Sequence, residues 1–449
     1  MLTVSTPTPS AQARSVTRFR WVICTLIFFE ITINYVDRIV FGQLAPELQK
    51  IFHWQNADIA DIAFWFEVAY EIGLAFVGRF LDRVGTRLGL ALSLAGWCLA
   101  SIFHAGMGTV LGFKLARFLL GLTESGAFPG ATKATAEWFP RRERALVAGI
   151  FNSGSNVGAI IAPLAVPWLF IHYGWRWAFI GTGVLGFIWL LFWLVLFRLP
   201  QDHPRVSSAE LAHILSDPPD EITEVIPWQR ILRTRQAWSF IMGKFFTDAI
   251  WRWNLYLLPL FFSQHFALNI KEFGPPFLVI YLMADVGSIG GGWLSSTLLK
   301  RGWTLNAARK IAMLLSVVCV LPIMLVTHVA SLWLAIFFVG LATAAHQGWS
   351  SNLYTSISDM FPKHAVATVA GIGGTAGGVG AMSLLAFTSS LFKSQAAQGG
   401  ATDHVYTILF TIAGFAYLSA LVCFQFLVPR MAPVTLAQIT PARKSIHGV

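Results

Sequence analysis

The stretch RWVICTLIFFEITINYVDRIVFGQLAP, residues 20–46, is long and apolar enough to cross a bilayer, yet it carries Asp37 and Arg38 in its interior. A transmembrane helix needs about 20 mainly apolar residues, and runs of this length recur along the whole chain. Of the 449 residues, 55% are hydrophobic and only 12% are charged, well below the charged share of a soluble domain. These features predict an all-α membrane protein with twelve transmembrane helices.

The twelve predicted spans form two groups of six. They cover residues 20–42, 58–78, 88–108, 111–134, 144–170 and 176–197, then 237–264, 275–298, 308–327, 331–357, 365–391 and 404–428. A polar stretch between the groups is typical of a linker, and within it the spacing of Ser207 and Glu210 predicts a short capped surface helix. Two halves joined in this way are typical of transporters that bind substrate near the bilayer midplane, in a central cavity between the halves.

The predicted domain organisation follows from these groups. It consists of an N-terminal tail (1–19), a six-helix half (20–198), a linker (199–236), a second six-helix half (237–429) and a C-terminal tail (430–449). The first span is too long and too interrupted by charge for a cleavable signal peptide, so we expect it to remain in the mature protein.

The positive charges are unevenly distributed between the predicted loops. When bases at the first residues of a span are counted with the adjoining tail or loop, the tails and even-numbered loops hold 22 Lys and Arg residues, whereas the odd-numbered loops hold 4. This bias predicts that both termini are cytoplasmic. It also explains the net charge of +10 without a nucleic-acid-binding surface. The four cysteines all lie within predicted spans without CxxC spacing, so we expect neither a metal site nor a disulfide.

The segment GRFLDRVGTR, residues 78–87, follows the second predicted span. We expect Gly78 to allow close approach of helices, Asp82 to pair with a base or a helix N-terminus, and Arg83 and Arg87 to anchor the cytoplasmic face. The segment resembles the loop that follows the second span in the major facilitator superfamily, and this resemblance implies a role in conformational gating. The alternative is that these are ordinary loop charges.

Ionisable residues inside spans are costly in hydrocarbon and therefore mark candidate functional sites. Arg117 and Glu124 are seven residues apart and share one helix face, whereas Asp37 and Arg38 point in different directions and should meet different neighbours. Arginine offers a planar fork that suits a carboxylate, and a buried acid can carry a proton. The alternative is that these four residues only neutralise one another.

Four segments carry a more specific resemblance: residues 34–38 (NYVDR), 116–163, 283–294 (MADVGSIGGGWL) and 345–352 (AHQGWSSN). They resemble the anion:cation symporter family of the major facilitator superfamily, and within it the bacterial hexuronate and related sugar-acid transporters. The resemblance covers nearly the whole chain except the tails and linker. It implies the major facilitator fold.

The resemblance also implies roles for individual residues. It implies Asp37 and Glu124 as proton sites, Arg38 as the coupling base and Arg117 as an anion ligand. The resemblance also implies Tyr35 and Tyr70 as cavity residues, and Lys133 matches the hexuronate-type pattern rather than the galactonate-type one. Ser155 stands where galactonate-type members have a polar amide, and the neighbouring Asn156 could substitute for that amide.

Other polar residues within the spans leave alternatives open. Glu67 and Glu71 are an i, i+4 acid pair that could extend the proton path or pair with Arg252 or Lys133. Asp248 and Arg252 could neutralise each other, whereas an Arg252 that faces the cavity would favour a second carboxylate and hence a diacid. We expect Asp285 to serve in helix packing or gating.

The second half offers uncharged polar and aromatic residues as candidate substrate ligands. Hydroxylated substrates need amide and hydroxyl partners and an aromatic platform, and the candidates are Trp251, Asn254, His346, Gln347 and Asn352, with Ser350 and Ser351 beside them. We expect His346 to bond a backbone carbonyl rather than relay protons. The run GIGGTAGGVGAM, residues 371–382, indicates helix mobility rather than phosphate binding.

Together these observations predict a secondary transporter that imports a sugar acid (hexuronate, aldonate or aldarate) by proton symport. The alternatives are a symporter of aromatic or dicarboxylic acids such as phthalate or tartrate, and a non-transporting membrane sensor. We find no nucleophile, ligand set or cofactor loop that an enzyme would need, so we expect no metal and no cofactor, with protons as the coupling ion. The expected setting is a monomer in the lipid of a bacterial cytoplasmic membrane.

Overall fold

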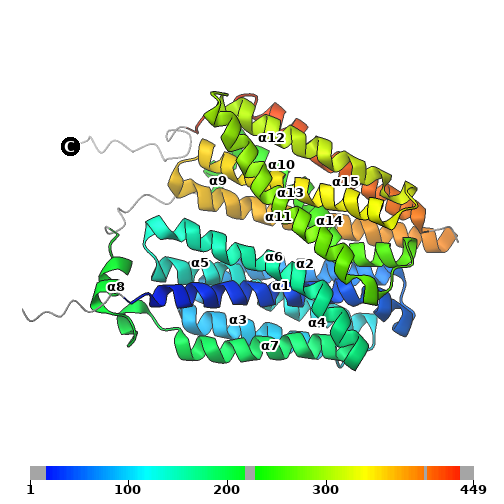
Figure 1. Ribbon diagram of the computed structural model, residues 1–449, viewed down its shortest axis with the longest axis horizontal. Coiled ribbons are helices and arrows are strands. Elements are labelled where there is room, and N and C mark those ends of the chain that lie inside the picture. The colour runs from blue at the N-terminus through cyan, green and yellow to red at the C-terminus, as the bar shows by residue number, and fades with distance from the viewer. Residues whose placement is uncertain (1–16, 218–227, 399–401, 435–449) are drawn as a thin grey trace, which may run out of the picture.

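The computed structural model describes residues 17–217, 228–398 and 402–434, and the regular elements in these ranges are helices. Figure 1 shows two bundles lying side by side, with the linker helices at one end. Most of the two predicted tails and residues 218–227 of the predicted linker lie outside the described residues. The predicted fold class, an all-α architecture of two helix bundles, is confirmed.

The first bundle precedes the linker. Its helices are α1 (Phe19–Phe52), α2 (Asn56–Val84), α3 (Thr86–His104), α4 (Val110–Glu124), α5 (Ala127–Trp138), α6 (Arg141–Tyr173) and α7 (Trp175–Leu196). The linker contains η1 (Pro200–Asp202), α8 (Ser208–Ile214) and α9 (Trp228–Ile231). The second bundle comprises α10 (Arg235–His265), η2 (Ile270–Glu272), α11 (Gly274–Lys300), α12 (Leu305–Val320), η3 (Leu321–His328), α13 (Leu332–Met360), α14 (Lys363–Gln398) and α15 (Asp403–Leu427).

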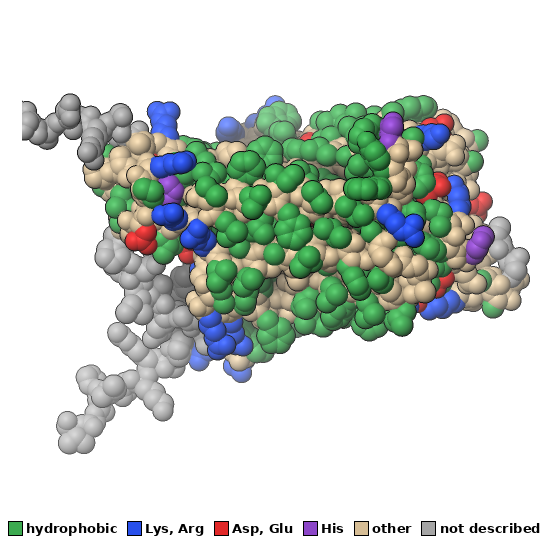
Figure 2. Space-filling model, turned by 90° about the horizontal axis from the view of Figure 1, so that it is seen from below, with side chains coloured by type: hydrophobic (Ala, Val, Ile, Leu, Met, Phe, Trp, Pro, Cys, Tyr) green, Lys and Arg blue, Asp and Glu red, His purple; other side chains and the backbone are tan. Residues whose placement is uncertain are grey.

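Within the described ranges, nine helices are long and apolar enough to cross a membrane. The other three predicted spans differ for identifiable reasons. The span predicted over 111–134 is divided at Ser125 and Gly126 into α4 and α5, while α2 and α10 carry several ionisable residues. Figure 2 shows hydrophobic side chains over the middle of one face and Lys and Arg side chains gathered mainly near its ends, as expected of a lipid-facing belt.

The two bundles are joined by polar contacts at the end of the molecule remote from α8 and α9. We call the end with α8 and α9 the linker side, and the other end the opposite side. On the opposite side Asp61 of α2 pairs with Lys393 of α14 at 3.0 Å. Gln264 of α10 donates to Gln49 and accepts from Asn56, both at 3.0 Å. These contacts hold the bundles together on the opposite side.

The linker stabilises the start of the first helix. As predicted, α8 begins after Ser207, whose side chain accepts a hydrogen bond from the backbone N–H of Glu210. The fully buried Glu210 carboxylate accepts hydrogen bonds from the backbone N–H groups of Phe19 and Arg20, each at 3.0 Å, and from the Thr17 hydroxyl at 2.6 Å. Since no side chain of α1 caps its own N-terminus, Glu210 supplies the negative charge that the helix dipole favours there.

We therefore expect Glu210→Ala to destabilise the protein by about 2 kcal/mol, because several charge-assisted hydrogen bonds are lost together. The control is Glu47→Ala, which removes only an exposed ion pair with Lys50. Unfolding of both variants would be followed in detergent micelles. Equal stability of the two variants would contradict the proposed capping role.

Candidate functional site

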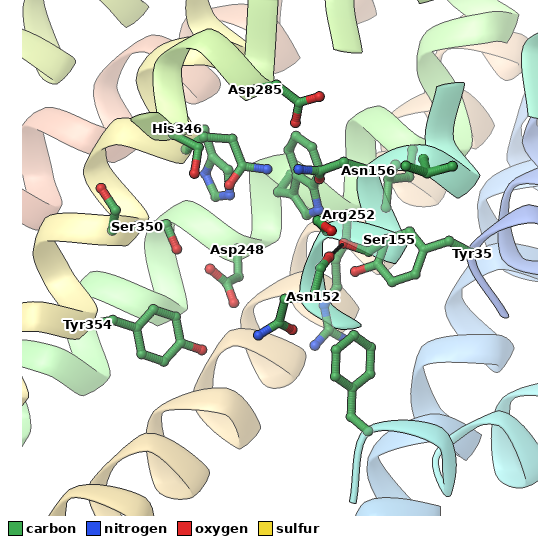
Figure 3. A pocket seen from close by; sticks show the side chains of 18 of the residues that line it. Tyr35, Asn152, Ser155, Asn156, Asp248, Arg252, Asp285, His346, Ser350 and Tyr354 are labelled. Carbon is green, nitrogen blue, oxygen red and sulfur yellow. Dashed lines mark hydrogen bonds between the residues drawn. The ribbon is translucent and has the colours of Figure 1, made fainter. Parts of the chain in front are cut away.

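A cavity of about 950 Å³ lies between the two bundles and is lined by residues from both. Several predicted site residues line it: Tyr35, Arg38, Tyr70, Ser155, Asn156, Trp251, His346 and Gln347. Figure 3 labels Tyr35, Ser155, Asn156 and His346 among them. Its lining extends to Gly149 and Tyr354, near the linker-side ends of α6 and α13. The cavity therefore lies between the cross-bundle contacts and the linker side.

Other predicted site residues do not line this cavity. They are Asp37, Arg117, Glu124, Lys133, Asn254 and Asn352. Arg117 is fully buried, donates to the backbone carbonyl of Arg38 at 3.1 Å and lies against the rings of Phe41 and Phe66. Asn352 donates to the backbone carbonyls of Gly291 and Gly348. In this conformation these two residues connect helices and have no access to a ligand in the cavity.

Arg38 connects the cavity to a buried acid. Its guanidinium contacts Oε2 of Glu124 through both Nε and Nη2 at 3.1 Å, and its other side faces the ring of Tyr70, with 4.5 Å between Cζ and the ring centroid. Glu124 is fully buried, and its Oε1 has no hydrogen-bond partner among the described residues. A group that binds Arg38 from the cavity therefore competes electrostatically with Glu124.

Asp37 points away from Arg38, as their positions on the helix predicted. Oδ1 of Asp37 accepts a hydrogen bond from the Ser101 hydroxyl at 3.0 Å, while its Oδ2 is buried without a partner in the described part of the chain. Glu30 and Asn34, on the same stretch of α1, are also fully buried with unpartnered polar atoms. The interior of the first bundle thus contains a polar stripe that the sequence interpretation did not identify.

Arg252 is paired across the bundle interface rather than with its own helix. Its Nη1 contacts both Glu67 and Glu71 of α2, whereas Asp248 pairs with Lys244 at 2.5 Å. The possibility that Asp248 and Arg252 neutralise each other is therefore wrong for this structure. Arg252 and Asp248 both line the cavity.

The second bundle contributes an aromatic wall. The rings of Trp251 and His346 stack with 4.9 Å between their centroids and 6° between their planes. His346 Nδ1 lies 2.7 Å from the Tyr417 hydroxyl. The partner of His346 is thus a tyrosine hydroxyl and not the backbone carbonyl that we expected. This bond fixes the His346 ring, and both stacked rings line the cavity.

Some cavity residues were missed or assigned otherwise from the sequence. Asn152 and Ser153 line the cavity, and their spacing of three to four residues from Ser155 and Asn156 could have identified them. Asp285, which we expected to serve in packing or gating, also lines the cavity. Within the described ranges, no group of three or more His, Cys, Asp or Glu side chains could hold a metal ion.

The predicted gating segment lies on the linker side, where it forms the end of α2, the turn at Gly85 and the start of α3. Asp82 pairs with Lys133 of α5 at 2.6 Å, and Arg87 donates to the backbone carbonyl of Leu194. The expected close helix approach at Gly78 is not found, because a Cβ there would meet no atom within 4 Å. The segment instead uses Gly85, whose φ of 84° lets the chain turn from α2 into α3.

Comparisons with known proteins agree with this architecture. Residues 27–385 match the family model described as "Major Facilitator Superfamily". The chain is 29% identical over 367 residues to the hexuronate transporter of Escherichia coli K12, covering 80% of this chain and 85% of that protein. It is 31% identical over 280 residues to the galacturonate transporter of Dickeya chrysanthemi, covering 61% of this chain and 81% of that protein.

A similar fold occurs in a solved structure. A bacterial homolog of the human lysosomal transporter Spinster, in an inward-facing and unoccupied conformation, superposes with a TM-score of 0.68 at 18% identity. The alignment covers 92% of this chain and 96% of that chain. At this identity the likeness shows the fold alone.

The contact between Arg38 and Glu124 predicts strong energetic coupling between the two residues. We expect Arg38→Met and Glu124→Met each to cost on the order of 3 kcal/mol, because each leaves a buried charge without its partner. The double variant should lose markedly less than the sum of the single losses. Thermal unfolding in detergent micelles gives the three values, and additive losses would contradict the pairing.

Proposed function

The chain belongs to the Major Facilitator Superfamily, and on this basis we propose that it imports a sugar acid together with protons by alternating access. It is a multi-pass membrane transporter related to bacterial sugar-acid transporters, not an enzyme. The proposal places it in the bacterial cytoplasmic membrane with both termini in the cytoplasm. The positive-inside bias supports this orientation.

The chemistry of the cavity supports a hydroxylated organic anion as substrate. Arg38 and Arg252 offer guanidinium groups for carboxylates. Hydroxyl groups of a sugar acid find hydrogen-bonding partners in the amides and hydroxyls of Asn152, Ser155, Asn156 and Gln347. The aromatic ring of Trp251, which lines the cavity, suits the apolar side of a sugar ring. The relatives named above as hexuronate and galacturonate transporters favour the same class.

The main support for the proposed proton coupling is the position of Arg38 between the cavity and Glu124. An anion that binds Arg38 weakens the contact of Arg38 with Glu124, and an ionised Glu124 without that contact is costly in a buried site. Uptake of a proton by Glu124 removes this cost. Binding of the anion and binding of a proton therefore favour each other.

The energetics of import require such a co-ion. Moving a monovalent anion inward against an inside-negative potential costs about 2.3 kcal/mol per 100 mV. One accompanying proton cancels this cost, and a second would make the potential assist uptake. Because the bundles are joined on the opposite side, we interpret the structure as the state that faces the linker side of an alternating-access cycle.

A symporter of dicarboxylic or aromatic acids is the second candidate. A second guanidinium at Arg252 favours a second carboxylate, and the stacked pair of Trp251 and His346 would also accept an aromatic ring. A thermal-shift screen of purified protein against hexuronates, aldonates, aldarates and aromatic acids separates these substrate classes.

The proposed function predicts that acidifying the outside of proteoliposomes stimulates accumulation of labelled galacturonate. Glu124→Gln should abolish this proton-driven accumulation and retain exchange of internal for external substrate, because it removes the proton site and leaves the binding cavity intact. Glu47→Gln, on the opposite side, serves as the matched control. Undiminished proton-driven accumulation by the Glu124→Gln variant would refute the assignment.

A further inference from the structure

Arg252 is a cavity residue that already has two acidic partners. It belongs to α10 of the second bundle, and its Nη1 contacts Oε2 of Glu67 and Oε1 of Glu71 on α2 of the first bundle, the latter at 3.1 Å. Its side chain retains 15% exposure and lines the cavity. Both acidic contacts use Nη1, and within the described ranges no residue accepts a hydrogen bond from Nε or Nη2. Two donor groups of the fork therefore remain for a ligand.

The two acids are not equivalent. Glu67 is satisfied at both oxygens, since Oε1 accepts from the Tyr256 hydroxyl at 2.7 Å and Oε2 contacts Arg252. Glu71 has only the contact between its Oε1 and Arg252, and its Oε2 is buried without a partner among the residues described. A proton on Oε2 of Glu71 disrupts no existing hydrogen bond. Glu71 is thus the member of the pair best placed to gain and lose a proton.

The charges around this group leave a single excess negative charge when both acids are ionised. Arg252 neutralises only one of the two carboxylates. Its helix neighbour Asp248 is itself paired with Lys244, so this pair adds no net charge.

The other packed elements do not remove the imbalance. From α1, Arg38 is engaged by Glu124, and Tyr35 is neutral. From α4, Arg117 lies against the rings of Phe66 and Tyr256. The charges of Arg117 and Arg38 are matched within the first bundle by Glu124 and Asp37 when both acids are ionised. From α2 the Tyr70 ring covers both Arg38 and Arg252. From α14 the backbone at Gly378 approaches the Glu71 carboxyl and brings no charge. In a buried site an excess charge of this kind is costly.

We propose that Glu67, Glu71 and Arg252 form a proton-operated carboxylate site, in which a proton on Glu71 lets Arg252 bind a second carboxylate of the transported anion. The incoming carboxylate then takes the place of the charge that Glu71 loses, and the net charge of the group stays unchanged. This inference rests on the proposed function and deepens it. It makes the preferred substrate a sugar diacid of the aldarate class.

Two arginine–acid pairs then serve one substrate. Arg38 with Glu124 and Arg252 with Glu71 each place a guanidinium on the cavity and a carboxyl behind it. One carboxylate and one proton are linked at each pair. A diacid would enter with two protons, whereas a hexuronate would use the first pair alone.

The test measures the affinity of purified protein for galactarate, which has two carboxylates, and for galacturonate, which has one, between pH 5.5 and 8. Linkage to one proton at Glu71 should make the ratio of the two affinities favour galactarate more strongly as the pH falls, by up to tenfold per pH unit. Glu71→Gln mimics the protonated acid, so its preference for galactarate should be strong and independent of pH. Arg252→Lys loses the fork and should lower the affinity for galactarate more than the affinity for galacturonate, so that the preference is lost.

Glu47→Gln is the matched control, because Glu47 pairs with Lys50 of its own helix and lies outside the cavity lining. It should behave as the wild type. If Glu71→Gln keeps the wild-type pH dependence, or if Arg252→Lys keeps the preference for galactarate, the inference is overturned while the proposed function stands. Failure of the wild-type protein to bind either acid would overturn both.

Discussion

A charge within the membrane is stable only beside a partner, and this constraint determines how the helices face one another around the cavity. Arg38 reaches Glu124 of α4, and Arg252 reaches Glu67 of α2. Each contact joins different helices, and the second joins the two bundles. Because a misrotated helix would leave a charge in hydrocarbon at a cost of several kcal/mol, these pairs select the packing as well as preparing the site.

The sequence predicts the elements better than it predicts their contacts. Apolar length identifies the spans because lipid tolerates no other pattern, and the angular separation of Asp37 and Arg38 follows from helix geometry alone. The partner of Arg252 could not be predicted in this way. Asp248, four positions from Arg252, is the nearer acid along the chain, and the pairing with the distant Glu67 and Glu71 depends on how the second bundle docks on the first.

The same limit explains the fate of the predicted ligands. Arg117 and Glu124 share a helix face, as their spacing requires, but that face packs against α1 and α2 instead of the cavity. The break at Ser125 and Gly126 did carry a signal that the predicted span overlooked, because a Ser-Gly dipeptide favours a turn and Pro129 and Gly130 follow it closely. Asn152 could likewise have been predicted from Ser155, because residues three apart on a helix share one face and both line the cavity.

The contact of Glu210 with the start of α1 has a consequence for biogenesis. The first helix leaves the ribosome long before residue 210 is synthesised. The backbone N–H groups at its start therefore lack the Glu210 carboxylate while the membrane segments of the first bundle are translated. Completion of the N-terminal bundle is thereby timed to the emergence of the linker. A chain truncated before α8 would contain every transmembrane helix of that bundle and still lack the hydrogen bonds between Glu210 and the start of α1.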